Sequence, residues 1–420
     1  MTNSRLTTLP SGLRVVTERM PHLETACLGF WVDVGARYEP AEVNGVAHML
    51  EHMAFKGTSR RTARGIAEEI ENVGGSLNAY TSREHTAYHA RVMAPDVPLA
   101  ADILADILQH STFEEGELEK ERNVVLQEIG EVQDTPDDLV FEILQEVAYP
   151  DQPLGRSILG PEEIVAGMQR QALVDYMGAH YHPSRMVLAA AGKVEHEAMC
   201  ELGERLLGEL PAAAPIAAPP GLYGGGERLE RRKDLEQVHL CLAVEAFGYA
   251  DPDYYALQVF SAALGGGMSS RLFQEVRENR GLCYSVFSFA ACQSDTGMLG
   301  IYAGTGEKDV ADLLPVSIEE TLKLASAPTG EELARARAQL KAGLLMSLES
   351  ASAQADDIAR QLLCYGRRIP TEEAVARIEA VDEAAIRRVG ERLFARTRPS
   401  LVALGPLRKL PGGALGQLAA

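Results

Sequence analysis

The sequence predicts an α+β protein built from two duplicated domains, each a largely antiparallel sheet covered by helices. First, its 420 residues exceed what one hydrophobic core usually supports, which favours two domains. Second, a segment rich in proline, alanine and glycine, residues 211–226, lies near the middle and reads as a linker. Third, the pattern of strands and helices repeats on its two sides. We therefore expect an N-terminal domain at 1–210 and a homologous C-terminal domain at 227–420.

Composition narrows the class of protein. An apolar fraction of 46% and a charged fraction of 24% are typical of a soluble globular protein. The net charge of −20 argues against a nucleic-acid partner, because phosphates would be repelled. The six cysteines are scattered, and no Cys-x-x-Cys pair occurs. No signal peptide and no run of 18 apolar residues is seen. These features predict a soluble cytoplasmic protein with reduced thiols and no membrane span.

Residue periodicity assigns the elements of the first half. Alternating and β-branched runs indicate strands, whereas apolar residues three and four apart indicate helices. Gly74 and Gly75 end one helix, and Pro136 interrupts another. The expected elements are strands at 13–16, 26–34 and 186–191, a hairpin over 76–93, and helices at 62–73, 96–109, 114–146 and 171–181.

The second half has a similar layout, with strands expected at 238–244, 284–291 and 297–303 and a helix at 254–263. The strongest local match aligns residues 117–122 with 332–337, at an offset of 215. At this offset Glu121 corresponds to Ala336, and Glu128 corresponds to Gly343. We therefore expect metal-binding residues in the first copy only.

The first copy carries His48, Glu51 and His52 in the order His-x-x-Glu-His, on a stretch expected to be helical. Positions i and i+4 of a helix share a face, so both imidazoles can reach one metal ion. Glu51 lies near the same face and can take a proton from a metal-bound water. Two imidazoles and a carboxylate suit a catalytic zinc ion with one position open to water. Histidine pairs also occur in helix cores, so a third ligand is required.

Other acidic and histidine residues have simpler explanations. His85 and His89 share the i, i+4 spacing, but in a strand they would lie about 13 Å apart and could not share an ion. Glu121 and Glu128 are two helical turns apart on one face of the expected helix. A solvated helix face explains most glutamates in this acidic stretch.

With these motifs the sequence resembles the pitrilysin (inverzincin) family of zinc peptidases, and within it the processing-peptidase subgroup and its bacterial relatives. The resemblance covers nearly the whole chain, and the bacterial relatives imply a bacterial cytoplasmic protein. In that family the third zinc ligand is a glutamate about 76 positions after the second histidine, which implies Glu128 here. It also implies that Glu121 orients a ligand, expected to be His52, and that each chain holds one Zn²⁺ ion.

The resemblance assigns further residues to substrate binding. Residues 75–81 are similar to the family's edge strand beside the zinc, where the substrate adds as an extra strand and Asn78 and Ala79 line the scissile bond. Arg277 and Tyr284, seven apart in the second half, match residues that hold the substrate main chain and hydrogen-bond the developing oxyanion.

Asp138 and Glu142 fall where processing peptidases place acidic residues that bind a substrate arginine, although a solvated helix face explains them nearly as well. The implied function is a zinc metalloendopeptidase that hydrolyses short or unfolded peptides in a closed chamber. The implied assembly is a homodimer, or a heterodimer with an inactive homologue. The alternatives are a non-catalytic structural subunit and a peptide-binding protein with little turnover.

Overall fold

The computed structural model describes residues 4–208, 210, 216–395 and 398–411. The chain divides into two compact units. Unit 1 comprises Met1–Glu131, Arg156–Pro219 and Met346–Arg368, and unit 2 comprises Val132–Gly155, Pro220–Leu345 and Ile369–Ala420. Each unit thus includes one segment from the other half of the sequence. In the expected linker, residues 216–225 have no regular structure, and residues 211–215 lie outside the described residues.

Unit 1 is built on a six-stranded sheet of order β1-β2-β6-β3-β5-β4. Only β2 and β6 pair in parallel, and the other neighbours are antiparallel. The strand β4 is an edge strand, because its one partner in the sheet is β5. The strands are β1 (Ser4–Thr8), β2 (Arg14–Arg19), β3 (Thr25–Val32), β4 (Ser76–Thr81), β5 (Thr86–Met93) and β6 (Met186–Gly192).

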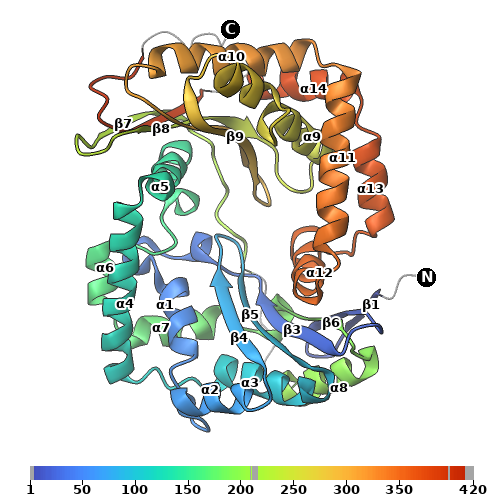
Figure 1. Ribbon diagram of the computed structural model, residues 1–420. Coiled ribbons are helices and arrows are strands. Elements are labelled where there is room, and N and C mark those ends of the chain that lie inside the picture. The colour runs from blue at the N-terminus through green and yellow to red at the C-terminus, as the bar shows by residue number, and fades with distance from the viewer. Residues whose placement is uncertain (1–3, 209, 211–215, 396–397, 412–420) are drawn as a thin grey trace. The chain divides into compact units, whose positions relative to one another are not determined.

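Helices cover both faces of this sheet. One face packs against helices of the first half, with Leu28, Phe30 and Tyr88 buried in the interface. The other face buries Trp31 and Val187 beneath α12 (Ala351–Tyr365), a helix that comes from the second half of the chain (Figure 1). The other helices of unit 1 are α1 (Val46–Ala54), α2 (Ala63–Glu71), α3 (Val97–His110), α4 (Glu115–Asp134), α6 (Glu162–Gly167), α7 (Arg170–His180) and α8 (His196–Leu207).

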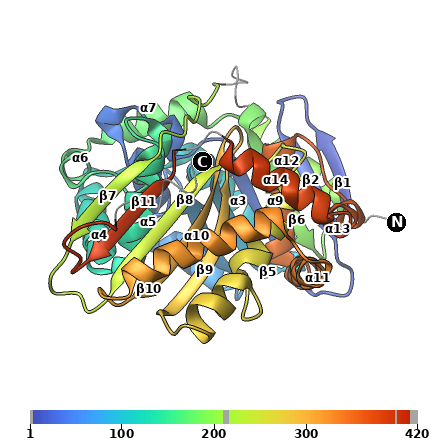
Figure 2. The ribbon, with the colours of Figure 1, turned by 90° about the horizontal axis from the view of Figure 1, so that it is seen from above.

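Unit 2 repeats this arrangement. Its sheet has the order β7-β11-β8-β10-β9, which matches β2-β6-β3-β5-β4 strand for strand. Helix α5 (Pro136–Ala148), from the first half, packs on one face through Val140 and Leu144. Helices α10 and α14 lie across the other face (Figure 2). The elements are β7 (Gly226–Arg231), β8 (Val238–Ala246), α9 (Tyr254–Gly265), β9 (Cys283–Cys292), β10 (Gly297–Thr305), α10 (Val310–Ser326), α11 (Gly330–Ser347), α13 (Thr371–Glu379), α14 (Glu383–Phe394) and β11 (Ser400–Gly405).

The predicted fold class, two related α+β sheets covered by helices, is confirmed. The break at Pro136 separates α4 from α5, as expected. Three strands were not predicted from the sequence: β1, β7 and β11. Strands β1 and β7 lie at sheet edges and contain mostly polar, partly exposed residues, so they lack the apolar alternation that marks a half-buried strand. His85 lies in the turn before β5 and not in a strand.

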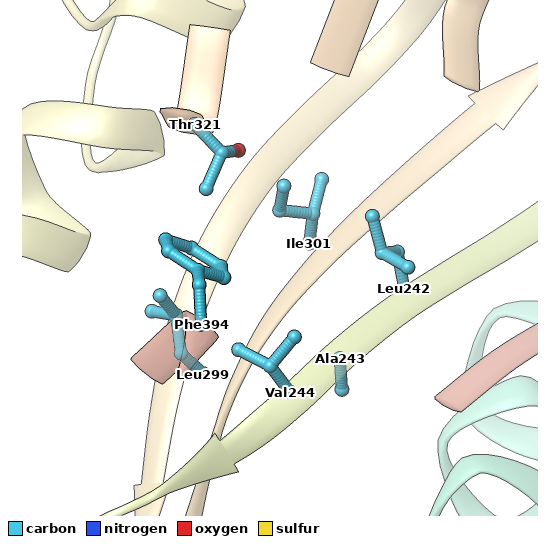
Figure 3. Close-up of a pocket in the computed structure, with 7 residues that line it drawn as sticks. All are labelled: Leu242, Ala243, Val244, Leu299, Ile301, Thr321 and Phe394. Atoms are coloured by element: carbon cyan, nitrogen blue, oxygen red, sulfur yellow. The ribbon is translucent and has the colours of Figure 1, made fainter. Parts of the chain in front are cut away.

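Packing in unit 2 leaves a small pocket between the sheet and helices α10 and α14 (Figure 3). Its lining is Leu242, Ala243, Val244, Leu299, Ile301, Thr321 and Phe394. The Thr321 hydroxyl donates to the Ser317 carbonyl oxygen at 2.7 Å, so the one polar side chain of this lining is already used. We regard the pocket as a packing feature of the apolar core.

Candidate active site

Helix α1 presents the His-x-x-Glu-His motif from a firmly anchored position. Its apolar residues Val46, Ala47, Met49, Leu50, Met53 and Ala54 are buried, which leaves His48, Glu51 and His52 half-buried on the remaining face. The buried Glu39 carboxylate caps the helix, because its two oxygens accept the Ala47 and Gly45 N–H groups, each at 2.8 Å. Packing and capping therefore both fix the orientation of the helix face that carries His48, Glu51 and His52.

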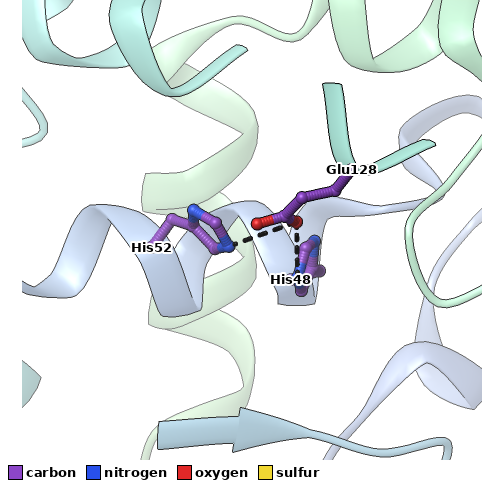
Figure 4. A group of neighbouring side chains, drawn as sticks. All are labelled: His48, His52 and Glu128. Atoms are coloured by element: carbon purple, nitrogen blue, oxygen red, sulfur yellow. Dashed lines mark ion pairs between the residues drawn. The ribbon is translucent and has the colours of Figure 1, made fainter. Parts of the chain in front are cut away.

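The third member of the cluster comes from α4. Leu118, Glu121 and Val125 are the buried residues of this helix, and Glu128 follows one turn later on the same face. The Oε2 atom of Glu128 lies 3.6 Å from Nε2 of His48 and 3.7 Å from Nε2 of His52 (Figure 4). In the described part of the chain, this is the one group whose donor atoms could hold a metal ion, all within 4.8 Å of one another.

The geometry of these three side chains fits a metal ion. The distances of 3.6 Å and 3.7 Å exceed those of hydrogen bonds, so the donor atoms converge on a shared point without bonding one another. The other ring nitrogen of His48, Nδ1, is buried and has no hydrogen-bond partner among the described residues. Burial, with the charge of His52 as a second cause, lowers the pKa of His48 to about 4. His48 is therefore a neutral imidazole, the form that ligates metals.

Glu121 lies directly behind His52, as expected from the sequence. Its Oε2 is 3.0 Å from His52 Nδ1, and its Oε1 is 2.7 Å from the Lys56 ammonium. A carboxylate facing Nδ1 places the ring proton there, which leaves the Nε2 lone pair directed toward Glu128. Lys56 was not identified from the sequence, although its position one turn after His52 is a signal that could have found it.

Glu51 is held by the edge strand β4. The Thr81 hydroxyl donates to Glu51 Oε2 at 2.6 Å, and the Thr81 backbone N–H also bonds this carboxylate. Burial raises the pKa of Glu51, while the bonds from Thr81 oppose this rise. Thr81 was missed in the sequence, yet it lies two residues after Ala79 and so shares its side of the strand.

The predicted substrate residues Asn78 and Ala79 lie on β4, with Asn78 exposed. The Ala79 N–H donates to the Asn78 side-chain oxygen at 2.9 Å. The Ala79 and Thr81 N–H groups therefore bond side chains, whereas Ser82 donates its N–H to His85 within the β4–β5 hairpin. This alternation directs the Ala79 N–H to the open edge of the sheet, where an added strand could bind.

Unit 2 brings Arg277 and Tyr284 together. The Arg277 guanidinium lies 5.3 Å from the Tyr284 ring centroid and 4.7 Å from that of Phe273. Arg277 belongs to a π-helical turn, Phe273–Glu278, and Tyr284 lies near the start of the edge strand β9. Tyr284 is 74% exposed, so its side chain is accessible to a bound molecule.

Asp138 and Glu142 lie one turn apart on α5, which is also part of unit 2. Asp138 is exposed and Glu142 is half-buried. The candidate site residues are thus divided between the two units. The metal cluster, Glu51, Glu121 and the strand β4 belong to unit 1.

Comparison with known proteins agrees with this geometry. Residues 14–162 match the family model described as insulinase (peptidase family M16), and residues 167–340 match the M16 inactive domain. The human mitochondrial-processing peptidase subunit beta is 43% identical over 425 residues, which cover 97% of this chain and 86% of that protein. A probable subunit beta from Arabidopsis thaliana is 43% identical over 97% of this chain and 79% of its own length. The chain belongs to the M16 peptidase family.

Solved structures share the fold. A protease from Helicobacter pylori aligns with a TM-score of 0.88 at 23% identity, covering 97% of this chain and all of that one (100%). A chain of the Candida albicans complex III2 structure aligns with a TM-score of 0.87 at 23% identity, covering 99% of this chain and 100% of that chain. In this M16 peptidase the metal cluster falls within the peptidase match, and Arg277 and Tyr284 fall within the inactive-domain match.

The expectation of a bacterial cytoplasmic protein is wrong. It is overturned by similar relatives that are mitochondrial-processing peptidase subunits, from human, Arabidopsis thaliana and Lentinula edodes. Composition and scattered cysteines indicate a reducing environment but do not identify the compartment, because receptors recognise separate targeting signals. Across the described residues of this M16 peptidase, no helix is both long and apolar enough to cross a bilayer.

Proposed function

We propose that this M16 peptidase is a zinc metalloendopeptidase that hydrolyses peptide bonds in short or unfolded peptides. The observation that carries the proposal is the convergence of His48, His52 and Glu128, with Glu51 tied to the edge strand β4. Two imidazoles and one carboxylate are a zinc donor set. A zinc ion bound by these three residues would lower the pKa of a water ligand and polarise the scissile carbonyl.

Glu51 serves as the general base. Its carboxylate accepts a proton from the attacking water and later delivers that proton to the leaving amine. Burial raises the pKa of Glu51, which makes it a stronger base than an exposed glutamate. The 2.6 Å bond from the Thr81 hydroxyl fixes the carboxylate in place. The residue thus combines a defined position with sufficient basicity.

Strand β4 receives the substrate as an added strand. The Ala79 N–H at the open edge offers a main-chain hydrogen bond that any extended peptide can use, whatever its side chains. Releasing the Asn78 oxygen from Ala79 frees this side chain to contact the substrate as well. Folded proteins lack accessible extended segments, so cleavage favours short or unfolded chains.

Unit 2 contributes substrate contacts in this proposal. Arg277 holds the substrate main chain, and the exposed hydroxyl of Tyr284 donates to the developing oxyanion. Asp138 and Glu142 bind an arginine near the cleaved bond through paired carboxylate oxygens. Cleavage-site mapping in a mixed peptide library checks this last role. Arginine enrichment near the cut should disappear in the Asp138→Asn/Glu142→Gln double variant, and a wild-type enzyme without such enrichment would remove the role.

The active assembly is a dimer that encloses the peptide, either with a second copy or with an inactive homologue. The support is that the similar relatives are named as subunits of a processing peptidase. Light scattering on the purified chain, alone and with candidate partners, distinguishes the two forms. A chain that is fully active as a monomer would refute both.

The Glu51→Gln substitution tests the function. The variant should bind zinc and peptide like the wild type but lose measurable cleavage, because glutamine cannot accept the proton. The matched control is Glu71→Gln, which changes an exposed glutamate at the C-terminal end of α2 in unit 1. If the zinc-loaded wild type cleaves no unfolded peptide, the chain is a non-catalytic peptide-binding or structural subunit.

A further inference from the structure

Helix α12, from the second half of the chain, makes a polar contact with β4, the edge strand proposed to receive the substrate. Most of its interface is apolar, formed by Ala355, Ile358, Ala359 and Leu362. Asp356 adds a polar contact, because it lies over the sheet and accepts two hydrogen bonds through one oxygen. The Tyr80 hydroxyl donates to Asp356 Oδ1 at 2.5 Å, and the indole N–H of Trp31 donates to the same atom at 3.0 Å.

The donors on this sheet face form a chain that ends at Asp356. The Tyr80 hydroxyl oxygen, which donates its proton to Asp356, also lies 3.2 Å from Nε2 of His85. Burial lowers the pKa of His85 to about 4, so the ring is neutral and has one N–H to donate. On the other side of His85, Ser82 contacts Nδ1 at 3.1 Å. The turn after β4, the strand itself and α12 are thereby linked.

The position of Tyr80 within β4 connects this network to the candidate site. Successive side chains of a strand point to opposite faces, so Tyr80 faces α12 while Ala79 and Thr81 face α1. The Ala79 N–H, which bonds the Asn78 side chain, faces the open edge of the sheet, and Thr81 holds Glu51. Anchoring Tyr80 therefore fixes the backbone between the two residues that serve the substrate and the general base.

We propose that Asp356 is a positioning residue for substrate binding, which acts through Tyr80 to hold the edge strand β4 in register to receive a peptide. The inference rests on the proposed function. An edge strand has one neighbour in its sheet, so a second anchor on its face reduces the ordering cost when the peptide adds. The anchor comes from a segment, 346–368, whose two ends both continue into unit 2.

The matched variants are Asp356→Ala and Asp357→Ala. Both residues lie on α12, with side chains 32% and 31% exposed, but Asp357 bonds Gln361 and Arg368 and not β4. We expect Asp356→Ala and Tyr80→Phe to raise KM for extended peptides of about ten residues roughly fivefold to tenfold, with kcat and zinc content little changed. Asp356→Asn, which keeps an acceptor, should restore part of the loss. Asp357→Ala should leave KM unchanged.

Peptide length and hydrogen exchange separate positioning from a general loss of stability. KM for a blocked tetrapeptide, which can make few main-chain bonds along β4, should change much less than KM for the ten-residue peptides. Amide exchange over residues 76–81 should accelerate in Asp356→Ala and Tyr80→Phe but not in Asp357→Ala. Equal exchange and equal KM in the Asp356 and Asp357 variants would overturn the proposal. If the wild type cleaves nothing, the proposed function fails, while the exchange comparison still decides whether Asp356 holds β4.

Discussion

Oε2 of Glu121 lies 3.0 Å from Nδ1 of His52, and the other carboxylate oxygen lies 2.7 Å from the ammonium of Lys56. The glutamate side chain is 7% exposed, so its charge is compensated mainly by these two neighbours. The contact between Glu121 and His52 sets which nitrogen of His52 faces the metal cluster. The two residues belong to different helices, α4 and α1, so the local sequence does not show this contact.

Glu121→Gln should weaken metal binding. The amide can accept a hydrogen bond but no longer carries the charge that makes the His52 ring a better donor, so we expect affinity for zinc to fall about tenfold to a hundredfold. Competition with a chelator of known affinity measures the change. The control is Glu115→Gln, an exposed residue in the first turn of α4. Equal zinc affinity in both variants would show that Glu121 serves Lys56 alone.

Thr81→Val should reduce turnover while leaving metal binding unchanged. The substitution keeps the shape of the side chain but removes the hydroxyl that donates to Glu51 at 2.6 Å. A hydrogen bond to a charged group is worth about 1.5–3 kcal/mol, so we expect kcat to fall at least about tenfold. Thr81→Ser retains the hydroxyl and serves as the control. A kcat for the valine variant within twofold of wild type would show that the backbone N–H suffices.

Glu39 should make stability depend on pH. Burial raises its pKa from 4.5 to about 7, despite opposing bonds from Ala47, Asn44 and Gly45. The folded state therefore holds the proton more tightly than the unfolded state, and the stabilisation present below pH 4.5 is lost as pH rises to about 7. The shift corresponds to about 3 kcal/mol.

Urea unfolding of the wild type and Glu39→Gln between pH 5 and pH 8 checks this titration. The variant cannot titrate at this position, so the stability advantage of the wild type should shrink as pH rises. The same pH dependence in both proteins would show that Glu39 stays ionised throughout this range.

Tyr284→Phe should lower kcat without affecting stability. The ring is 74% exposed, so removing its hydroxyl costs the fold little. If the hydroxyl donates to the oxyanion, kcat should fall about a hundredfold, as with other lost oxyanion donors, with KM nearly constant. Steady-state kinetics and thermal unfolding measure the two effects. A variant with normal kcat would restrict Tyr284 to its contact with Arg277.

Prediction from sequence succeeded where the signal is local. The motif helix, the β4–β5 hairpin and the break at Pro136 all follow from residue spacing within a few turns or one strand pair. The assignment of Glu128 required a resemblance, because nothing within α4 distinguishes it from other glutamates of that helix. Strands β1 and β7 were missed because polar edge strands lack the alternation that burial imposes.

The sequence by itself determined that His48 and His52 share a helix face with Glu51 nearby, since the period of a helix requires it. Only the tertiary structure decided which distant groups meet them: Glu128 and Glu121 from α4, and Thr81 from β4. It also decided that α12 packs on the first sheet and α5 on the second. The physical reason is that helix and strand periods act between near neighbours, whereas these contacts depend on how whole elements pack to bury their apolar faces.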